Sequence, residues 1–329
     1  MPAAIVFSFD PILSVGGFSV RWETIGVAVA AFAAIVVAGL IARATPLNLS
    51  LPADAPSDEP GELNHLRRDD LLYITVAALP GAVVGGRLGY ALLHLDYYQA
   101  NPSTLLTVGQ GGFELALAVV GGFATAAIVA ALLGAPVGRW MHALVLPVLL
   151  AIAGGKAAMV LGGTGQGLPV DLSWATAYLG AGPWGSLAPE IPSHPAQAYE
   201  ALATAVVILV VMAFVELGAF PGRNGGAFLL GIGLWATARA VVAITWRDRP
   251  VVGQLGMDQV ICIVIAVSCL VLLLLVGTGA KVRARRRQGA GDALAAAPGE
   301  APAPNAPKPA APSDPSTPEW PDPEARPRI

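Results

Sequence analysis

Long apolar stretches constrain this chain more than any other feature. About 20 mostly apolar residues cross the hydrocarbon core of a membrane as a helix, and seven stretches of about that length occur. None shows the strict alternation of apolar and polar residues that a membrane β-barrel requires. We therefore predict an all-α integral membrane protein with seven transmembrane helices. The predicted spans are residues 24–42, 71–95, 115–138, 143–163, 197–217, 225–246 and 259–280.

Composition supports a membrane protein. Hydrophobic residues make up 55% of the chain and charged residues only 12%, against about 25% charged residues in an average soluble domain. The net charge of −3 excludes a nucleic-acid protein that works through a basic surface. Cys262 and Cys269 lie seven residues apart on one predicted helix, too far along its axis to bridge. We expect no disulfide.

The loops between the spans carry an asymmetric distribution of Lys and Arg. Cytoplasmic loops of membrane proteins hold the excess of these residues, which predicts an outside N-terminus and a cytoplasmic C-terminus. Trp22, Trp140 and Trp246 fall at predicted span ends, where an aromatic belt is expected. The basic loops contain Arg43, Arg67, Arg68, Arg139, Arg223, Lys281, Arg283, Arg285, Arg286 and Arg287, and the opposite loops contain Arg21, Arg247 and Arg249.

Two further segments are distinct from the spans. The outer loop 164–193 has no Lys or Arg but contains Trp174, Tyr178 and Trp184, and loops of this length usually serve a function. We predict a small extracytoplasmic head, with an idle connector as the alternative. Segment 289–329 is rich in proline and alanine and predicts a disordered cytoplasmic tail after a membrane domain 1–288.

Three cations lie inside predicted spans: Arg87, Lys156 and Arg239. Each costs roughly 2.5–3.5 kcal/mol at the centre of a membrane helix, so each needs a reason to be there. We expect them to converge on a water-accessible cavity in the outer half of the membrane that binds an anion, and the abundant anion there is a phospholipid phosphate. The alternative is ion pairing with carboxylates. The candidate carboxylates are Glu114, Glu200 and Glu216.

Polar residues also open the fifth span. Gln197 and Glu200 fall on one helix face, and His194 would lie at the outer interface with Glu200 about 9 Å deeper. This cluster, which includes Tyr199, either faces the same cavity as the cations or is only a hydrogen-bonded helix start.

Asp258 sits in the first turn of the last span, where the helix dipole favours a carboxylate. The histidines have no metal-site spacing, so we assign no metal and no cofactor.

The order of motifs resembles the bacterial prolipoprotein diacylglyceryl transferases, collinearly over about residues 9–276. Two motifs carry most of the resemblance. Gly85-Gly86-Arg87-Leu88-Gly89-Tyr90 is similar to the family's G-G-R-x-G-Y, and His194-Pro195-Ala196-Gln197-Ala198-Tyr199-Glu200 is similar to its H-P-[ST]-Q-x-Y-E. Phe9-Asp10-Pro11, Gly111-Gly112, Gly231-Ile232-Gly233 and Met257-Asp258-Gln259 add weaker matches.

This chain departs from the family pattern at several motif positions that bear on the family's reaction. In the family's arginine-containing signature G-R-x-G-N-[FL]-x-N-x-E, this chain has Lys156 for the arginine. Lysine keeps the charge but loses the guanidinium fork. Met159, Gly162 and Thr164 replace the signature's Asn and Glu residues, and no histidine follows Gly111-Gly112.

The resemblance implies an enzyme that transfers diacylglyceryl from phosphatidylglycerol to the lipobox cysteine thiol of exported prolipoproteins. It implies that Arg87, Lys156, Arg239, Gln197 and Tyr199 bind the lipid phosphate. Its catalytic group would be His194, Glu200 and Arg239, with Glu114 as a further candidate base. The alternative is a catalytically impaired relative that binds phospholipid or prolipoprotein without turnover. A transporter is the weaker third reading, because no inverted repeat is evident.

Overall fold

The computed structural model describes residues 4–45, 66–107 and 112–296. The chain forms two units, Met1–Ala280 and Lys281–Ile329. The first unit holds the helical bundle, and the second begins within the last helix. Gly111 of the Gly111-Gly112 motif, His65, which is one of the histidines considered as metal ligands, and residues 297–329 of the predicted tail lie outside the described residues.

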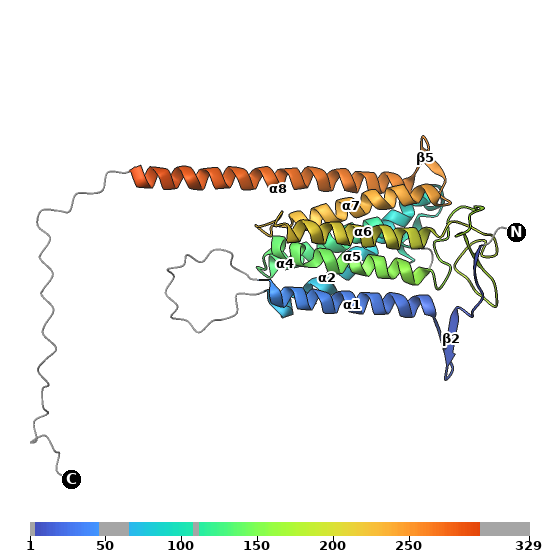
Figure 1. Cartoon of the computed structure of the whole chain (residues 1–329). Coiled ribbons are helices and arrows are strands. Elements are labelled where there is room, and N and C mark those ends of the chain that lie inside the picture. Colours follow the sequence, from blue (N-terminus) through green and yellow to red (C-terminus); the bar gives the residue numbers. More distant parts are fainter. Residues whose placement is uncertain (1–3, 46–65, 108–111, 297–329) are drawn as a thin grey trace, which may run out of the picture. The chain divides into compact units, whose positions relative to one another are not determined.

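Long helices dominate the first unit (Figure 1). Seven of the described helices are long and apolar enough to cross a membrane, which confirms the predicted number. A short helix α3 (Leu95–Ala100) and the 3-10 helix η1 (Pro102–Leu106) follow the second of them. The seven are α1 (Trp22–Ala44), α2 (Arg68–Leu93), α4 (Leu115–Leu132), α5 (Val137–Met159), α6 (Ala196–Glu216), α7 (Gly226–Val242) and α8 (Met257–Ala296).

The predicted boundary between the third and fourth spans is wrong. Helix α4 ends at Leu132 and α5 begins at Val137, whereas the sequence predicted one span up to residue 138 and the next from 143. Gly134 adopts a left-handed backbone conformation with φ +67°, which ends α4, and Pro136 precedes the first turn of α5. Both residues are apolar, so hydropathy alone did not mark the turn.

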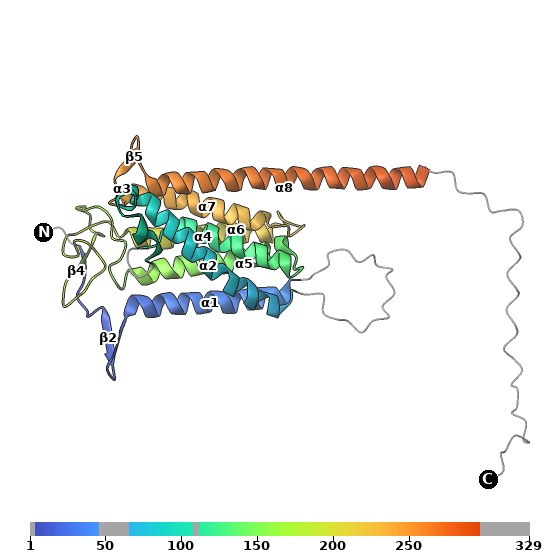
Figure 2. The same cartoon turned by 180° about the vertical axis from the view of Figure 1, so that it is seen from behind.

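Glycines allow α2 and α4 to pack backbone against backbone. A Cβ placed on Gly81 would collide with the carbonyl oxygen of Gly121, and one on Gly85 with that of Leu117. Small residues spaced four apart permit this close approach in membrane helices. The second close pair is α1 with α5, and α5 also packs on α6 and α7. Figure 2 shows α2, α3 and α4 from the opposite side.

Strands occur only in short pairs among the described residues. β1 (Ile5–Phe7) pairs in parallel with β4 (Thr176–Tyr178), which joins the N-terminal segment to the loop 164–193. β2 (Ile12–Val15) and β3 (Phe18–Arg21) form a hairpin. Its turn, Gly16-Gly17, has positive φ at both residues, the conformation that a two-residue hairpin prefers. β5 (Pro250–Val252) and β6 (Leu255–Gly256) form a second hairpin.

The core lies between α4, α5, α6, α7 and α8, around Leu149, Val211 and Trp235. Large apolar residues such as Phe32 and Leu209 are exposed on the outside of the helices, as expected of a bundle surrounded by lipid. Trp140 departs from the predicted aromatic belt, because it is only 2% exposed and packs inside the bundle.

Helix α8 continues to Ala296, past the predicted domain boundary at residue 288. The segment 289–296 is therefore helical, where the sequence predicted no regular structure. Four of its eight residues are alanine (Ala290, Ala293, Ala295 and Ala296), and alanine has the highest helix propensity. The prolines of the tail begin only after this point, at Pro298.

Candidate functional site

Five charged side chains meet at one end of the bundle. Arg239 Nη1 donates to Glu200 Oε1 at 2.5 Å, and Lys156 Nζ lies 2.8 Å from Glu200 Oε2. Arg239 Nη2 contacts Asp258 Oδ2 at 3.1 Å and Glu114 Oε1 at 3.3 Å. We define these five residues as the ion cluster: Glu114, Lys156, Glu200, Arg239 and Asp258.

The directions of the helices explain why these residues meet. They also explain why the carboxylates lie at helix N-termini and the cations at helix C-termini. Glu114 caps α4 at its N-terminus, accepting from the backbone N–H groups of Ala116 and Leu117. The other two carboxylates lie near the N-termini of α6 and α8, and both cations lie in the last turns of α5 and α7. Helix dipoles favour anions at N-termini and cations at C-termini.

The ion cluster confirms part of the prediction about the buried cations, since two of the three converge. Lys156 and Arg239 do converge, together with Glu200. They are not unpaired, however, since both bind carboxylates. The alternative of ion pairing, with Glu114 and Glu200 as partners, is therefore realised for these two cations.

Arg87 does not join the ion cluster. Its guanidinium donates to four backbone carbonyl oxygens of the segment after α2 and lies 5.5 Å from the ring centroid of Tyr98. The predicted convergence of three cations is thus wrong for Arg87. The reason is geometric: the chain beyond α2 folds back and offers this side chain carbonyl acceptors. These belong to Thr104, Leu105, Thr107 and Gly112.

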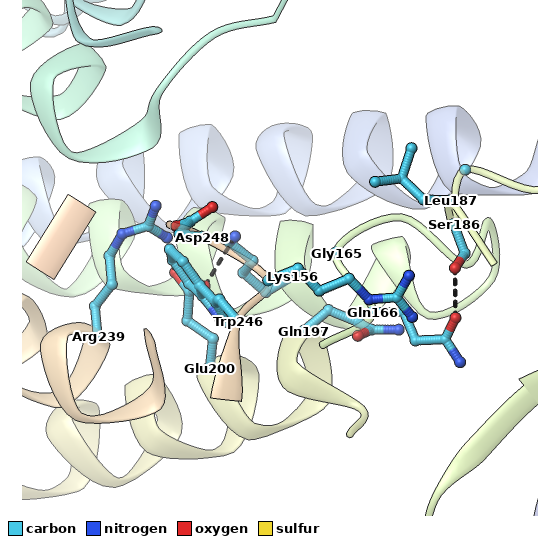
Figure 3. Close-up of a pocket in the computed structure, with 12 residues that line it drawn as sticks. Lys156, Gly165, Gln166, Ser186, Leu187, Gln197, Glu200, Arg239, Trp246 and Asp248 are labelled. Carbon is cyan, nitrogen blue, oxygen red and sulfur yellow. Dashed lines mark hydrogen bonds and ion pairs between the residues drawn. The ribbon is translucent and has the colours of Figure 1, made fainter. Parts of the chain in front are cut away.

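A polar pocket of about 280 Å³ opens beside the ion cluster (Figure 3). Lys156, Glu200 and Arg239 form one part of its wall. Two charged residues that the sequence analysis did not single out, Arg247 and Asp248, form another. The remaining lining residues are Gly165, Gln166, Gly185, Ser186, Leu187, Gln197 and Trp246.

Trp246 directly follows a candidate span that ends at Thr245, as predicted, and its ring also lies against two cations. Its ring centroid lies 4.5 Å from the guanidinium carbon of Arg239 and 5.8 Å from Nζ of Lys156. A cation over an aromatic face is stabilised by the quadrupole of the ring.

A hydrogen bond to Tyr178 holds the side chain of Gln197 in the pocket wall. Gln197 is 1% exposed, and its Nε2 donates to the hydroxyl of Tyr178 at 3.0 Å, while its Oε1 has no hydrogen-bond partner in the described structure. The prediction that Gln197 and Glu200 share one face is confirmed, because both line the pocket. Burial, the larger cause, and the charge of Glu23 raise the pKa of Tyr178 to about 12.

His194 and Tyr199 lie apart from the pocket. His194 Nδ1 is 3.4 Å from the hydroxyl of Tyr199, and that hydroxyl accepts from Nε1 of Trp174 at 2.8 Å. The two residues thereby fasten the loop 164–193 to the start of α6. Neither belongs to the pocket lining, so of the polar cluster at the start of the fifth span only Gln197 and Glu200 face the same cavity as the cations.

An apolar cleft of about 450 Å³ lies between the pair α2–α4 and the pair α1–α5. Its lining includes Leu115, the residue after Glu114 of the ion cluster, and continues along the helices to Ala130 and Val137. Its wall is almost wholly hydrocarbon, with Thr75 as a polar exception. Within the described ranges, no group of three or more His, Cys, Asp or Glu residues could hold a metal ion.

Known proteins resemble this chain over most of its length. A family model described as prolipoprotein diacylglyceryl transferase matches residues 11–275. Relatives named phosphatidylglycerol–prolipoprotein diacylglyceryl transferase include one from Polynucleobacter asymbioticus, 28% identical over 79% of this chain and 93% of the relative. One from Methylocella silvestris is 31% identical over 71% and 81%, and one from Gluconacetobacter diazotrophicus is 29% identical over 82% and 90%.

The match includes all the elements that build the site, from the start of the β2–β3 hairpin to the apolar part of α8. It also includes the five residues of the ion cluster and the lining of the polar pocket. This chain therefore belongs to the prolipoprotein diacylglyceryl transferase family.

Proposed function

We propose that this protein transfers the diacylglyceryl group of phosphatidylglycerol to the lipobox cysteine of exported prolipoproteins. The single observation that carries the proposal is the position of the polar pocket. It contains two buried, ion-paired cations and lies at the same end of the bundle as Glu114, after which the apolar cleft begins. A phospholipid has the same two parts, an anionic head and a long apolar tail.

The phosphate is assigned to the cations of the pocket wall. Lys156, Arg239 and Arg247 face the pocket with two carboxylates, Glu200 and Asp248, so the lining carries one net positive charge. Arg247 takes the place that the sequence analysis gave to Arg87. Its Nε and Nη2 bind Gly167 and Ser193, which fixes the guanidinium at the pocket. Positive groups here would also stabilise the charge that develops on departing glycerol phosphate.

The lipid tail is assigned to the apolar cleft. Its volume is about 450 Å³, within the usual range of small-molecule sites, roughly 300–1,000 Å³. Each buried methylene contributes about 0.8 kcal/mol. The cleft would therefore hold an acyl chain firmly and leave the reacting glyceryl carbon at the cations.

The proposed direction of the chain in the bacterial inner membrane places the N-terminus and the polar pocket outside and the C-terminus in the cytoplasm. The asymmetry of Lys and Arg supports it. A reporter fused after Arg287 should be cytoplasmic. A cysteine in place of Trp174, whose side chain is 51% exposed, should react with a membrane-impermeant label from outside, while buried Cys262 and Cys269 stay silent. Labelling and reporter on the same side would contradict this direction.

The function is tested with purified protein in phosphatidylglycerol vesicles and a peptide that contains a lipobox. We expect mass spectrometry to detect a diacylglyceryl thioether on the peptide cysteine, and none with phosphatidylethanolamine vesicles. A peptide with serine for the cysteine serves as the control. Binding of phosphatidylglycerol without any thioether would overturn the proposal and indicate a lipid-binding relative of the enzymes.

A further inference from the structure

The proposed transfer needs a proton acceptor, and the pocket offers few. A cysteine thiol has a pKa of about 8.5 and is mostly protonated at neutral pH, whereas the thiolate is the nucleophile. A group that takes the proton must therefore reach the pocket and have a free lone pair. The inference below rests on the proposed function.

Most ionisable groups around the pocket are already engaged. Both carboxylate oxygens of Glu200 bind cations, and a carboxylate paired in this way is a weak base. Lys156 and Arg239 are its partners. Arg247, the third cation, donates to Gly167 and Ser193.

The bases suggested by sequence lie elsewhere or are occupied. His194 is outside the pocket lining and faces the hydroxyl of Tyr199. The oxygens of Glu114 accept from the backbone N–H groups of Ala116 and Leu117, and one of them also binds Arg239. Glu114 cannot receive a proton from a thiol in the pocket without breaking these bonds, and His194 is excluded by its position outside the pocket lining.

Asp248 differs from all of them. It lines the pocket, yet its carboxylate takes part in no hydrogen bond or ion pair among those found in the described part of the chain. It lies on the connection between η2 (Ala243–Thr245) and β5 and is partly exposed to solvent. Figure 3 shows it on the side of the pocket where the side chains of Lys156 and Arg239 end.

We propose that Asp248 is the general base of the transfer. Its carboxylate takes the proton of the lipobox thiol, and the sulfur electron pair forms the bond to the terminal glyceryl carbon of the lipid. The bond between that carbon and the phosphate oxygen breaks, and its electron pair leaves with glycerol phosphate. The proton on Asp248 then passes to the departing phosphate or to water, so the carboxylate is restored.

The charges around Asp248 set its basicity. Arg239 of α7 and His94 at the end of α2 favour the ionised form, Asp258 of α8 opposes it, and Arg247 and Arg249 flank it on its own loop. Partial removal from water, the largest cause, and the charge of Asp258 raise the pKa of Asp248 above its ordinary value. A raised pKa makes a carboxylate a better proton acceptor.

The test compares rates of thioether formation by the parent protein and Asp248→Asn between pH 6 and 10. General bases typically contribute about 10²–10⁴-fold, so we expect kcat to fall roughly 10²-fold or more at pH 7. The loss should shrink steeply above about pH 8.5, because the thiol then ionises without help. Asp248→Glu should recover most of the rate.

Asp171→Asn is the matched control, since Asp171 is an exposed aspartate of the outer loop that does not line the pocket. A loss that is equal at every pH, or no loss in Asp248→Asn, overturns the role of Asp248 and leaves the proposed function standing. Absence of thioether from the parent protein overturns the proposed function, and the role of Asp248 with it.

Discussion

Nζ of Lys156 lies 2.8 Å from Oε2 of Glu200, and this ion pair links the last turn of α5 to the first turns of α6. Glu200 binds Arg239 through its other oxygen. One carboxylate therefore holds both cations of the pocket wall in fixed positions. A phosphate that enters the pocket meets these cations already placed, which lowers the cost of ordering them.

The first prediction concerns Glu200→Gln. The amide keeps the shape but removes the charge that both cations share, and breaking a buried ion pair from one side costs on the order of 3 kcal/mol. We expect a clearly lower thermal unfolding midpoint in detergent. Glu216→Gln changes an exposed glutamate of the same helix and should leave the midpoint unchanged. Equal midpoints for the two variants would contradict the role of Glu200.

Hydropathy predicted the helices well because each span is an almost unbroken apolar run, and a run of this length is typical of a membrane-spanning helix. It failed at Gly134 and Pro136, where a turn is built from apolar residues. The β2–β3 hairpin could have been predicted from Gly16-Gly17 between two short apolar segments, a turn signal that the search for spans did not consider.

Only part of the ion cluster could be predicted from the sequence. The motif spacing placed Gln197 and Glu200 on one face, and the cost of buried charge marked Lys156 and Arg239. The sequence analysis interpreted Asp258 only as a carboxylate favoured by the dipole of its own helix, because a sequence does not show which helix ends lie next to one another. The loop residues Arg247 and Asp248 reach the pocket only through the fold, so no local pattern marked them.

The second prediction concerns Arg87. Since its guanidinium binds four backbone carbonyl oxygens, three of them at or next to η1, Arg87→Ala should free η1 and raise hydrogen exchange there and in α3. Arg87→Lys should not restore protection, because one ammonium group cannot reach the same acceptors. Exchange in α5 and α6 should stay as in the parent. A uniform change across all helices would instead indicate general loss of the fold.

The third prediction is a pH dependence that arises from Tyr178, whose folded-state pKa of about 12 exceeds the ordinary value of about 10. The folded protein holds this proton more tightly than the unfolded chain. The contribution to the free energy of unfolding is therefore complete below pH 10 and is lost between about pH 10 and 12, a decrease of about 2–3 kcal/mol.

The phenolate absorbance of the parent minus that of Tyr178→Phe isolates this titration from the other tyrosines. The difference should appear near pH 12. A midpoint near pH 10 would mean that the hydroxyl beside Gln197 is open to water.

The central claim is that the cations of the polar pocket bind a lipid phosphate for transfer to a thiol. It is tested most directly by the thioether yield of Lys156→Ala and Lys156→Arg with phosphatidylglycerol and a lipobox peptide. Arg43→Ala, which removes an exposed cation at the last turn of α1, is the control. We predict no product from Lys156→Ala, product from Lys156→Arg because the charge remains, and parent yield from the control. Parent yield from Lys156→Ala would contradict the account.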